Sequence, residues 1–584
     1  MKTFFKTFFA AFLALIVFFL LTIGVLIAIA SGLSNDPKPT VGKNAVLVID
    51  LSNDINEQAE QNELAELFGN ANSGKPGLYD IVRMLHHAKT DTSIKALYIK
   101  AGSNINGLAT NQELRNAILD FKKTDKPVWA YGEAISQVAY YTASAADKIY
   151  CHPQGGVEWK GFAMTTLFLK NLLDRLDIEP EIFYAGKFKS ATEPFRATAM
   201  TEANRLQTTE WLNDTYAEVI KAIAISRKKD TGYIRELANT AAIRSSADAV
   251  KYGLCDGAIY EDEVQDLIRK ELNIKSDADI NFVALSKYYR AANFKATKGD
   301  NKIAIIYAQG DVQDGKGDDE SIGSEAFVKL IRNARMDEDV KAIVFRVNSP
   351  GGSSLASDAI WREVSLARRA KPFIVSMGDV AASGGYYIAV AADSIFAEPT
   401  TITGSIGVFS IYANLKDFFS NKLGITYDGV KTAPYADLGS AIRPLTDIER
   451  RMIQDGVDSI YLTFKKRVSV GRLKNIYAVD SIAQGRVWTG NDALRNGLVD
   501  KIGGLQDAVN CAAKMAKLTD YRTREYPEPK SIMDQLMTAS TYNQLFQSKP
   551  DFNTETLLLL KKADKIKEMI AIPQSKLPFD YIIE

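Results

Sequence analysis

Short, predominantly apolar runs alternate with amphipathic stretches along most of the chain. Apolar runs cover residues 45–49, 303–307, 342–347 and 373–377. Continuous runs of this kind are typical of strands that are buried on both faces of a sheet. The stretch 357–369 instead carries apolar residues at nearly helical spacing. The alternation predicts an α/β protein with parallel sheets and helices packed on their outer faces.

The first thirty residues follow a different pattern. Lys2 and Lys6 precede an uncharged run over residues 7–31, which exceeds the roughly 20 residues that cross a bilayer as a helix. A cleavable signal peptide has a shorter apolar core of about 7–15 residues, although Ala28 and Ala30 form the A-x-A pattern of a cleavage site. We predict an uncleaved anchor with cleavage as the alternative. The positive-inside rule then places the rest of the chain outside the cytoplasmic membrane.

The remaining sequence repeats itself at long range. The run 94–100 resembles 340–346, and the tyrosine pair 140–141 resembles 386–387, with an offset of 246 both times (340 minus 94, 386 minus 140). One long period indicates two copies of a domain. The predicted segments are a cytoplasmic N-terminus (1–6), a transmembrane anchor (7–31), a linker (32–43), an N-terminal α/β repeat (44–295), a C-terminal α/β repeat (296–530) and a helical tail (531–584), whose residues 557–570 have a helical pattern.

Composition excludes several classes of function. Lys+Arg and Asp+Glu both total 71, so the net charge is zero, which argues against nucleic acid as a partner. Cys151, Cys255 and Cys511 match no zinc spacing and no even-numbered disulfide framework, so we expect unpaired thiols. The sequence has no metal-ligand constellation and no phosphate-binding loop with a lysine. We therefore expect neither a metal nor a cofactor.

Small residues surround one hydroxyl, that of Ser383, in the segment 378–387. An apolar, helix-like run follows, so this serine would lie beside the free backbone N–H groups of a helix start. Together with the amides of Gly351 and Gly352, these donors would stabilise an oxyanion. A plainer alternative is that Ser383 is only the N-cap of that helix.

A histidine is a poor candidate for the base that would activate Ser383. The chain has only His86, His87 and His152, all in the first copy. A lysine replaces histidine in Ser-Lys pairs, provided that burial lowers its pKa enough to keep it neutral. The candidate is Lys189.

The two copies differ in a complementary way at these positions. Gln137 stands where the second copy has Ser383, and Thr432 aligns with Lys189. One copy therefore has the lysine without the serine, and the other has the serine without the lysine. For Lys189 alone, a solvated surface residue is the commoner alternative, but the complementary pattern favours one site that both copies share.

Four motifs in this order resemble the signal peptide peptidase A (protease IV) family in its long, two-copy form. They lie at 189–195, 348–353, 382–387 and 403–407. The resemblance implies tandem domains of the crotonase/Clp-protease fold and a serine protease. It also implies a homotetramer in the bacterial inner membrane that degrades cleaved signal peptides. The implied site residues are Ser383 (nucleophile), Lys189 (general base), Ser405 (positions the lysine amine), Gly352 and Gly384 (oxyanion amides) and Gly351 (shapes the turn).

Two other functions stay open at this point. A crotonase-type acyl-CoA enzyme would share the fold and the paired glycine amides without a Ser-Lys pair. A catalytically inactive scaffold would bind envelope partners and retain the fold alone.

Overall fold

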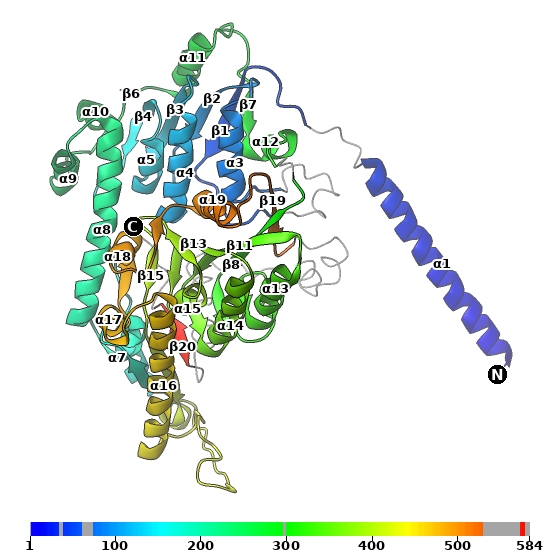
Figure 1. Ribbon diagram of the computed structural model, residues 1–584, viewed down its shortest axis with the longest axis vertical. Helices are drawn as coiled ribbons and strands as arrows, with labels where there is room; N and C mark the ends of the chain where they lie inside the picture. The colour runs from blue at the N-terminus through cyan, green and yellow to red at the C-terminus, as the bar shows by residue number, and fades with distance from the viewer. Residues whose placement is uncertain (1, 34–38, 61–73, 296–298, 529–572, 578–584) are drawn as a thin grey trace.

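The computed structural model describes residues 2–33, 39–60, 74–295, 299–528 and 573–577. Two α/β bodies stack on each other, and a long helix stands apart from them (Figure 1). The first copy forms one body and the second copy forms most of the other. Helix α8 (Glu202–Arg227) belongs to the first copy and runs along both bodies.

The first body contains a six-stranded parallel sheet in the order β6-β4-β3-β2-β1-β7. Helices α3, α4, α5 and α8 cover one face, and α11 covers the other. The central strands are therefore buried on both faces over most of their length, which is why they are mainly apolar. The strands are β1 (Ala45–Asp50), β2 (Ile94–Lys100), β3 (Val128–Ile135), β4 (Lys148–Val157), β6 (Gly257–Ala258) and β7 (Phe282–Ala284).

The second body repeats this arrangement in an eight-stranded sheet. Its path is β17-β15-β13-β11-β8-β19, with β14 beside β13 and β18 beside β14, and all pairs are parallel except β15 with β17. The strands are β8 (Lys302–Gln309), β11 (Val340–Ser349), β13 (Phe373–Ala382), β14 (Ser394–Ala397), β15 (Ile402–Gly404), β17 (Val487–Thr489), β18 (Lys501–Ile502) and β19 (Arg522–Tyr526).

A third sheet joins the two copies. Its order is β10-β9-β12-β20-β16-β5, and β5, from the first copy, pairs antiparallel with β16 of the second over seven residues. The two copies therefore share one sheet within a single chain. The strands are β5 (Glu179–Ala185), β9 (Asp311–Gln313), β10 (Ser321–Gly323), β12 (Gly351–Ser353), β16 (Val408–Asn414) and β20 (Gln574–Lys576).

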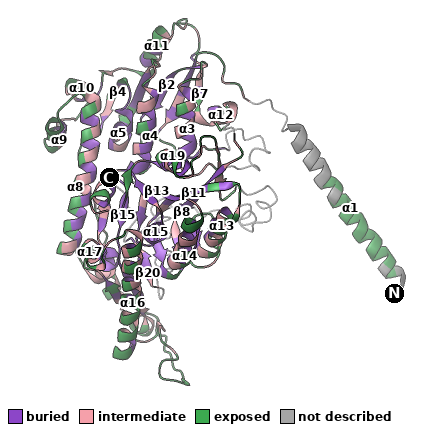
Figure 2. Cartoon of the chain, in the orientation of Figure 1, coloured by how far each residue is buried: buried purple, intermediate pink, exposed green. Residues whose placement is uncertain are grey.

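Helices fill the layers outside the sheets, and buried residues line the sheet faces (Figure 2). In the second body, α13 to α16 pack on one face and α19 on the other. The helices besides α1 and α8 are α3 (Leu78–Ala88), α4 (Leu108–Phe121), α5 (Gln137–Ala143), α6 (Lys170–Arg175), α7 (Glu193–Arg196), α9 (Thr231–Asn239), α10 (Ser246–Lys251), α11 (Glu261–Glu271), α12 (Leu285–Ala291), α13 (Ser324–Met336), α14 (Ser354–Ala370), α15 (Gly384–Ala389), α16 (Asp447–Gly471), α17 (Ile476–Ile482), α18 (Gly490–Arg495) and α19 (Leu505–Met515), with short turns at η1 (Ser190–Thr192) and η2 (Phe418–Lys422).

Two segments outside the apolar runs of the sequence also form strands. The segment after Met377 continues β13 to Ala382, because residues 380–382 pair with β15. The glycine segment 351–353 forms β12, because it pairs with β9 and β20. The helical pattern at 557–570 lies outside the described residues, whereas residues 574–576 of the predicted helical tail form strand β20.

Helix α1 covers Lys2–Leu33, which includes the predicted anchor 7–31. Many of its apolar side chains face solvent, including Phe8 (53% exposed) and Phe18 (69% exposed). Taken over the residues that the structure describes, no helix reaches the length and apolar character needed to cross a membrane.

Candidate active site

Ser383 lies at the junction between β13 and α15. Its backbone has φ 54° and ψ −115°, a strained conformation for a residue with a side chain. The serine occupies the N-cap position of α15, but its side chain makes no capping hydrogen bond. The N-cap alternative therefore accounts for its place in the chain and leaves the hydroxyl available for another role.

The hydroxyl of Ser383 faces the amine of Lys189. Lys189 Nζ lies 2.8 Å from Ser383 Oγ, 3.1 Å from Ser405 Oγ and 3.3 Å from the Ser405 carbonyl oxygen. All three residues are at most 1% exposed. Burial lowers the pKa of the Lys189 amine well below its usual value, because a charged amine loses its hydration there. The arrangement thus favours a neutral amine beside a serine hydroxyl.

The first copy delivers Lys189 into the second body through the shared sheet. Strand β5 ends at Ala185, and a short turn then places Lys189 against the segment around Gly485. A Cβ on Gly485 would lie 2.6 Å from the Lys189 backbone nitrogen, and its φ is +74°. Only glycine allows this close approach without strain. The lysine is therefore held by backbone packing as well as by its hydrogen bonds.

The glycines of the predicted oxyanion hole converge beside Ser383. A Cβ on Gly384 would lie 3.0 Å from the backbone nitrogen of Gly352, and one on Gly351 would lie 2.7 Å from the backbone nitrogen of Gly384. Gly351 has φ +106°, a conformation that other residues rarely adopt. Two backbone N–H groups thus come together next to the hydroxyl, as stabilisation of an oxyanion requires.

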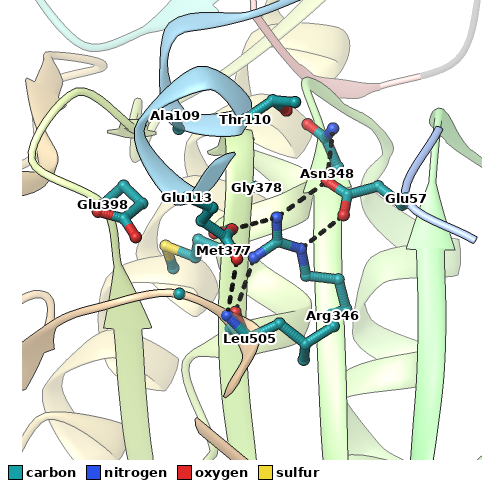
Figure 3. A network of polar contacts seen from close by, with 12 residues as sticks. Glu57, Ala109, Thr110, Glu113, Arg346, Asn348, Met377, Gly378, Glu398 and Leu505 are labelled. Carbon is teal, nitrogen blue, oxygen red and sulfur yellow. Dashed lines mark hydrogen bonds and ion pairs between the residues drawn. The ribbon is translucent and has the colours of Figure 1, made fainter. Parts of the chain in front are cut away.

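A buried ionic network supports the strands that lead to this site (Figure 3). The Arg346 guanidinium, on β11, donates to both carboxylate oxygens of Glu57 at 2.8 and 3.2 Å and lies 2.6 Å from a carboxylate oxygen of Glu113. It also donates to the Met377 carbonyl oxygen at 3.1 Å. Burial raises the pKa of the Glu57 carboxyl and raises that of the neighbouring Glu398 well above its usual value.

This network connects the two copies, because both carboxylates that contact Arg346 belong to the first copy. Asp379 makes a second connection in the opposite direction. Its carboxylate accepts hydrogen bonds from the backbone N–H groups of Ala109 and Thr110, at 2.8 and 3.0 Å, at the start of α4. Sequence reasoning missed both residues. An arginine inside the apolar run 342–347 was the available signal, since a buried charge needs a partner.

The first copy has Gln137 at the position that corresponds to Ser383. The Gln137 side-chain oxygen accepts hydrogen bonds from the backbone N–H groups of Lys160 and Gly161, both at 2.8 Å. Its amide nitrogen donates to the Gly161 carbonyl oxygen at 2.9 Å. The Gln137 side chain is thus hydrogen-bonded to the neighbouring backbone at the position where the second copy has Ser383. Thr432, aligned with Lys189, is exposed.

The other candidates from the sequence lie elsewhere. His86 and His87 belong to α3 and contact Asp120 and Tyr288, whereas His152 packs against Tyr260. The three cysteines are free thiols. Within the described ranges, no group of three or more His, Cys, Asp or Glu residues is placed to hold a metal ion.

Comparison with known proteins decides the family. The model of peptidase family S49 matches the chain twice, over residues 120–275 and 365–519. The chain belongs to peptidase family S49. The two matches correspond to the two copies, and they contain Lys189 and Ser383 respectively. This S49 chain is therefore a serine protease, and the acyl-CoA alternative is not supported.

Relatives of the S49 chain extend over most of its length. It is 35% identical to "Protease 4" of Salmonella typhi, over 90% of this chain and 86% of the relative. It is 34% identical to "Protease 4" of Haemophilus influenzae, over 84% and 82%. It is 31% identical to the chloroplastic "Serine protease SPPA" of Arabidopsis thaliana, over 82% and 71%. A solved ClpP1 mutant of Listeria monocytogenes aligns with 35% of this chain and 94% of its own at 14% identity and a TM-score of 0.24, a likeness too slight to define the fold.

Proposed function

We propose that the chain hydrolyses apolar peptides with Ser383 as the nucleophile and Lys189 as the general base. One observation carries the proposal: a fully buried amine with a depressed pKa lies 2.8 Å from a buried, strained serine hydroxyl. A lysine must be neutral to accept a proton, and here burial alone favours that state. Ser405 also contacts the amine, through its hydroxyl at 3.1 Å and its carbonyl oxygen at 3.3 Å.

The reaction proceeds by two acyl transfers. Lys189 Nζ accepts the hydroxyl proton while Ser383 Oγ attacks the scissile carbonyl carbon. The amides of Gly352 and Gly384 stabilise the negative charge that develops on the carbonyl oxygen. Lys189 then donates the proton to the leaving amine, which leaves an ester on Ser383. The same lysine then deprotonates a water molecule, which attacks the carbonyl carbon of the ester. The bond between this carbon and Ser383 Oγ breaks, the lysine returns the proton to that oxygen, and the carboxylic acid product leaves.

We propose that the substrates are cleaved signal peptides and similar apolar peptides at the outer face of a bacterial cytoplasmic membrane. The exposed apolar side chains of α1 support its role as the single-pass anchor of residues 7–31. Deletion of residues 2–33 should release the protein from the membrane pellet to the soluble fraction, whereas continued sedimentation with membranes would contradict the anchor.

The family resemblance also supports a homotetramer. Because β5 completes the site within one chain, assembly is not needed to bring Lys189 to Ser383. Light scattering after gel filtration should give the mass of four chains, and the mass of one chain would contradict the tetramer.

The activity is tested with purified protein and a quenched fluorescent peptide that has an apolar core. The intact chain should cleave the peptide, and Ser383→Ala should abolish cleavage. Ser394→Ala is the matched control, because this serine is also buried but lies on β14, away from Lys189. Wild-type cleavage by Ser383→Ala would contradict the proposal.

A further inference from the structure

Strand β20 fills a gap one strand wide in the shared sheet, beside the candidate active site. Strand β12 forms one wall and β16 the other, and β20 lies between them, antiparallel to both. Without β20 the sheet would divide into β10-β9-β12 and β16-β5. Without β20, the gap would be a groove with two free strand edges, to which a peptide in extended conformation would bind by main-chain hydrogen bonds. In this structure the occupant is the chain's own residues 573–577, here called the resident segment.

The resident segment passes directly over the oxyanion glycines. Ser575 is paired with Gly352. A Cβ on Gly351 would lie 2.0 Å from the Ser575 carbonyl oxygen, and one on Gly384 would lie 3.0 Å from it. The carbonyl of the bond between Ser575 and Lys576 therefore lies where the scissile carbonyl of a substrate would bind.

Side chains and flanking main chain hold the resident segment in this register. Ser575 Oγ lies 3.0 Å from Ser354 Oγ, and Lys576 Nζ lies 2.6 Å from a carboxylate oxygen of Asp311. The Leu577 backbone N–H donates to the Pro350 carbonyl oxygen at 2.7 Å. These contacts place all three residues, and the neighbouring backbone, in a defined position.

Leu577 is the apolar anchor of the resident segment. Its side chain is 3% exposed and belongs to a cluster with Trp211, Ala382, Ile402 and Val487. Trp211 comes from α8 of the first copy, and Ala382 immediately precedes Ser383. The pocket is therefore built by both copies next to the nucleophile. It accepts the apolar side chain of the second residue after the peptide bond whose carbonyl lies at the oxyanion glycines.

We propose that the resident segment occupies the substrate groove of its own chain and competes with peptide substrates, with Leu577 as its anchor. The inference rests on the proposed function, since the groove is identified by its place beside Ser383 and Lys189. A tethered occupant has a high effective concentration, on the order of millimolar. Substrate must displace it, so the tail raises the apparent KM of the full chain.

The test introduces Leu577→Asp into the full-length protein. A carboxylate in the apolar pocket is unfavourable, so the resident segment should leave the groove. We expect kcat/KM for the apolar peptide to rise about fivefold or more, mainly through a lower KM. Leu577→Met is the matched control, because it keeps an apolar side chain of similar volume. Equal kcat/KM for the two variants would overturn the proposal.

A peptide added in trans gives a second measurement that does not depend on the fate of the tail. The peptide with the sequence of residues 573–577 should inhibit Leu577→Asp competitively at millimolar concentration. The same peptide with Ser575→Pro should not inhibit, because proline removes the N–H at the residue paired with Gly352. Equal inhibition by both peptides, or by neither, would overturn the proposed binding mode.

Failure of the proposed function is recognised separately. If the wild-type protein and Leu577→Asp both cleave no peptide, that function is wrong. Occupancy is then measured by fluorescence anisotropy of a labelled apolar peptide with Ser383→Ala, alone and combined with Leu577→Asp. Binding about fivefold tighter to the combined variant supports the resident segment, and equal affinities overturn it.

Discussion

Lys189 Nζ lies 2.8 Å from Ser383 Oγ, although the two residues are 194 positions apart and come from different copies of one domain. The pairing of β5 with β16 brings them together within a single chain. Each copy retains the fold, but only one catalytic group remains in each. The duplicated architecture thus makes a single site from two halves, and the ionic network around Arg346 holds those halves in register.

The burial of Lys189 determines the expected pH dependence of the activity. The reaction needs the neutral amine, and burial shifts the pKa of Lys189 well below 10.5. We expect kcat/KM to rise with pH as the amine loses its proton, with a midpoint well below the usual lysine value. Peptide hydrolysis measured between about pH 5 and 11 checks this. A midpoint at the usual lysine value would show that the reactive amine is solvated.

Ser405 should act through the position of the lysine amine. Its hydroxyl lies 3.1 Å from Lys189 Nζ, so Ser405→Ala should lower kcat by about 10- to 100-fold, which is less than the roughly 100- to 10,000-fold that proton transfer itself contributes. KM should change little. The midpoint of the pH profile should also move to lower pH, because an acceptor for the protonated amine is lost. An unchanged kcat and pH midpoint would exclude this positioning role.

Gly384 should be intolerant of any side chain. A Cβ there would lie 2.8 Å from Ser357 Oγ and 3.0 Å from the Gly352 backbone nitrogen. We expect Gly384→Ala to displace the oxyanion donors and to lower kcat by about 100-fold or more. Gly429→Ala serves as the control, because a Cβ there meets nothing within 4 Å. Similar kcat values for the two variants would argue against an oxyanion role.

Arg346 should contribute strongly to the free energy of unfolding. Arg346→Met removes the cation from the buried carboxylates of Glu57 and Glu113, and an uncompensated buried charge costs about 3–5 kcal/mol. Urea unfolding at neutral pH measures the loss. Arg495→Met is the control. The Arg495 side chain is 65% exposed, so its ion pairs should contribute less than about 1 kcal/mol. Equal losses of unfolding free energy in the two variants would mean that the buried network stabilises the fold no more than an exposed ion pair does.

Periodicity and repeat comparison predicted much of this arrangement. Apolar runs identified β1, β8, β11 and β13, because strands buried on both faces consist mainly of apolar residues. The constant offset of 246 paired Gln137 with Ser383, and the structure places Lys189 beside that serine. Local residue chemistry and internal comparison were sufficient for these features.

Other features depend on long-range contacts that leave little local signal. Residues 574–576 carry no strand pattern of their own, and they become a strand only because β12 and β16 offer two open edges. Gly351 to Ser353 likewise form a strand only through their pairing with β9 and β20. The partners of Arg346 lie 289 and 233 positions away in the chain (346 minus 57, 346 minus 113), beyond the reach of any local pattern.

The most direct test of the shared site is a double-mutant cycle on peptide hydrolysis. It compares kcat/KM for the wild-type protein, Ser383→Ala, Lys189→Ala and the variant with both substitutions, with exposed Lys187→Ala as the control. Residues that act as one catalytic unit show strongly non-additive losses. We predict that each single variant loses at least about 1,000-fold and that the double variant loses no more than the worse single variant. Losses that multiply in the double variant, or wild-type activity in either single variant, would contradict a Ser383–Lys189 pair.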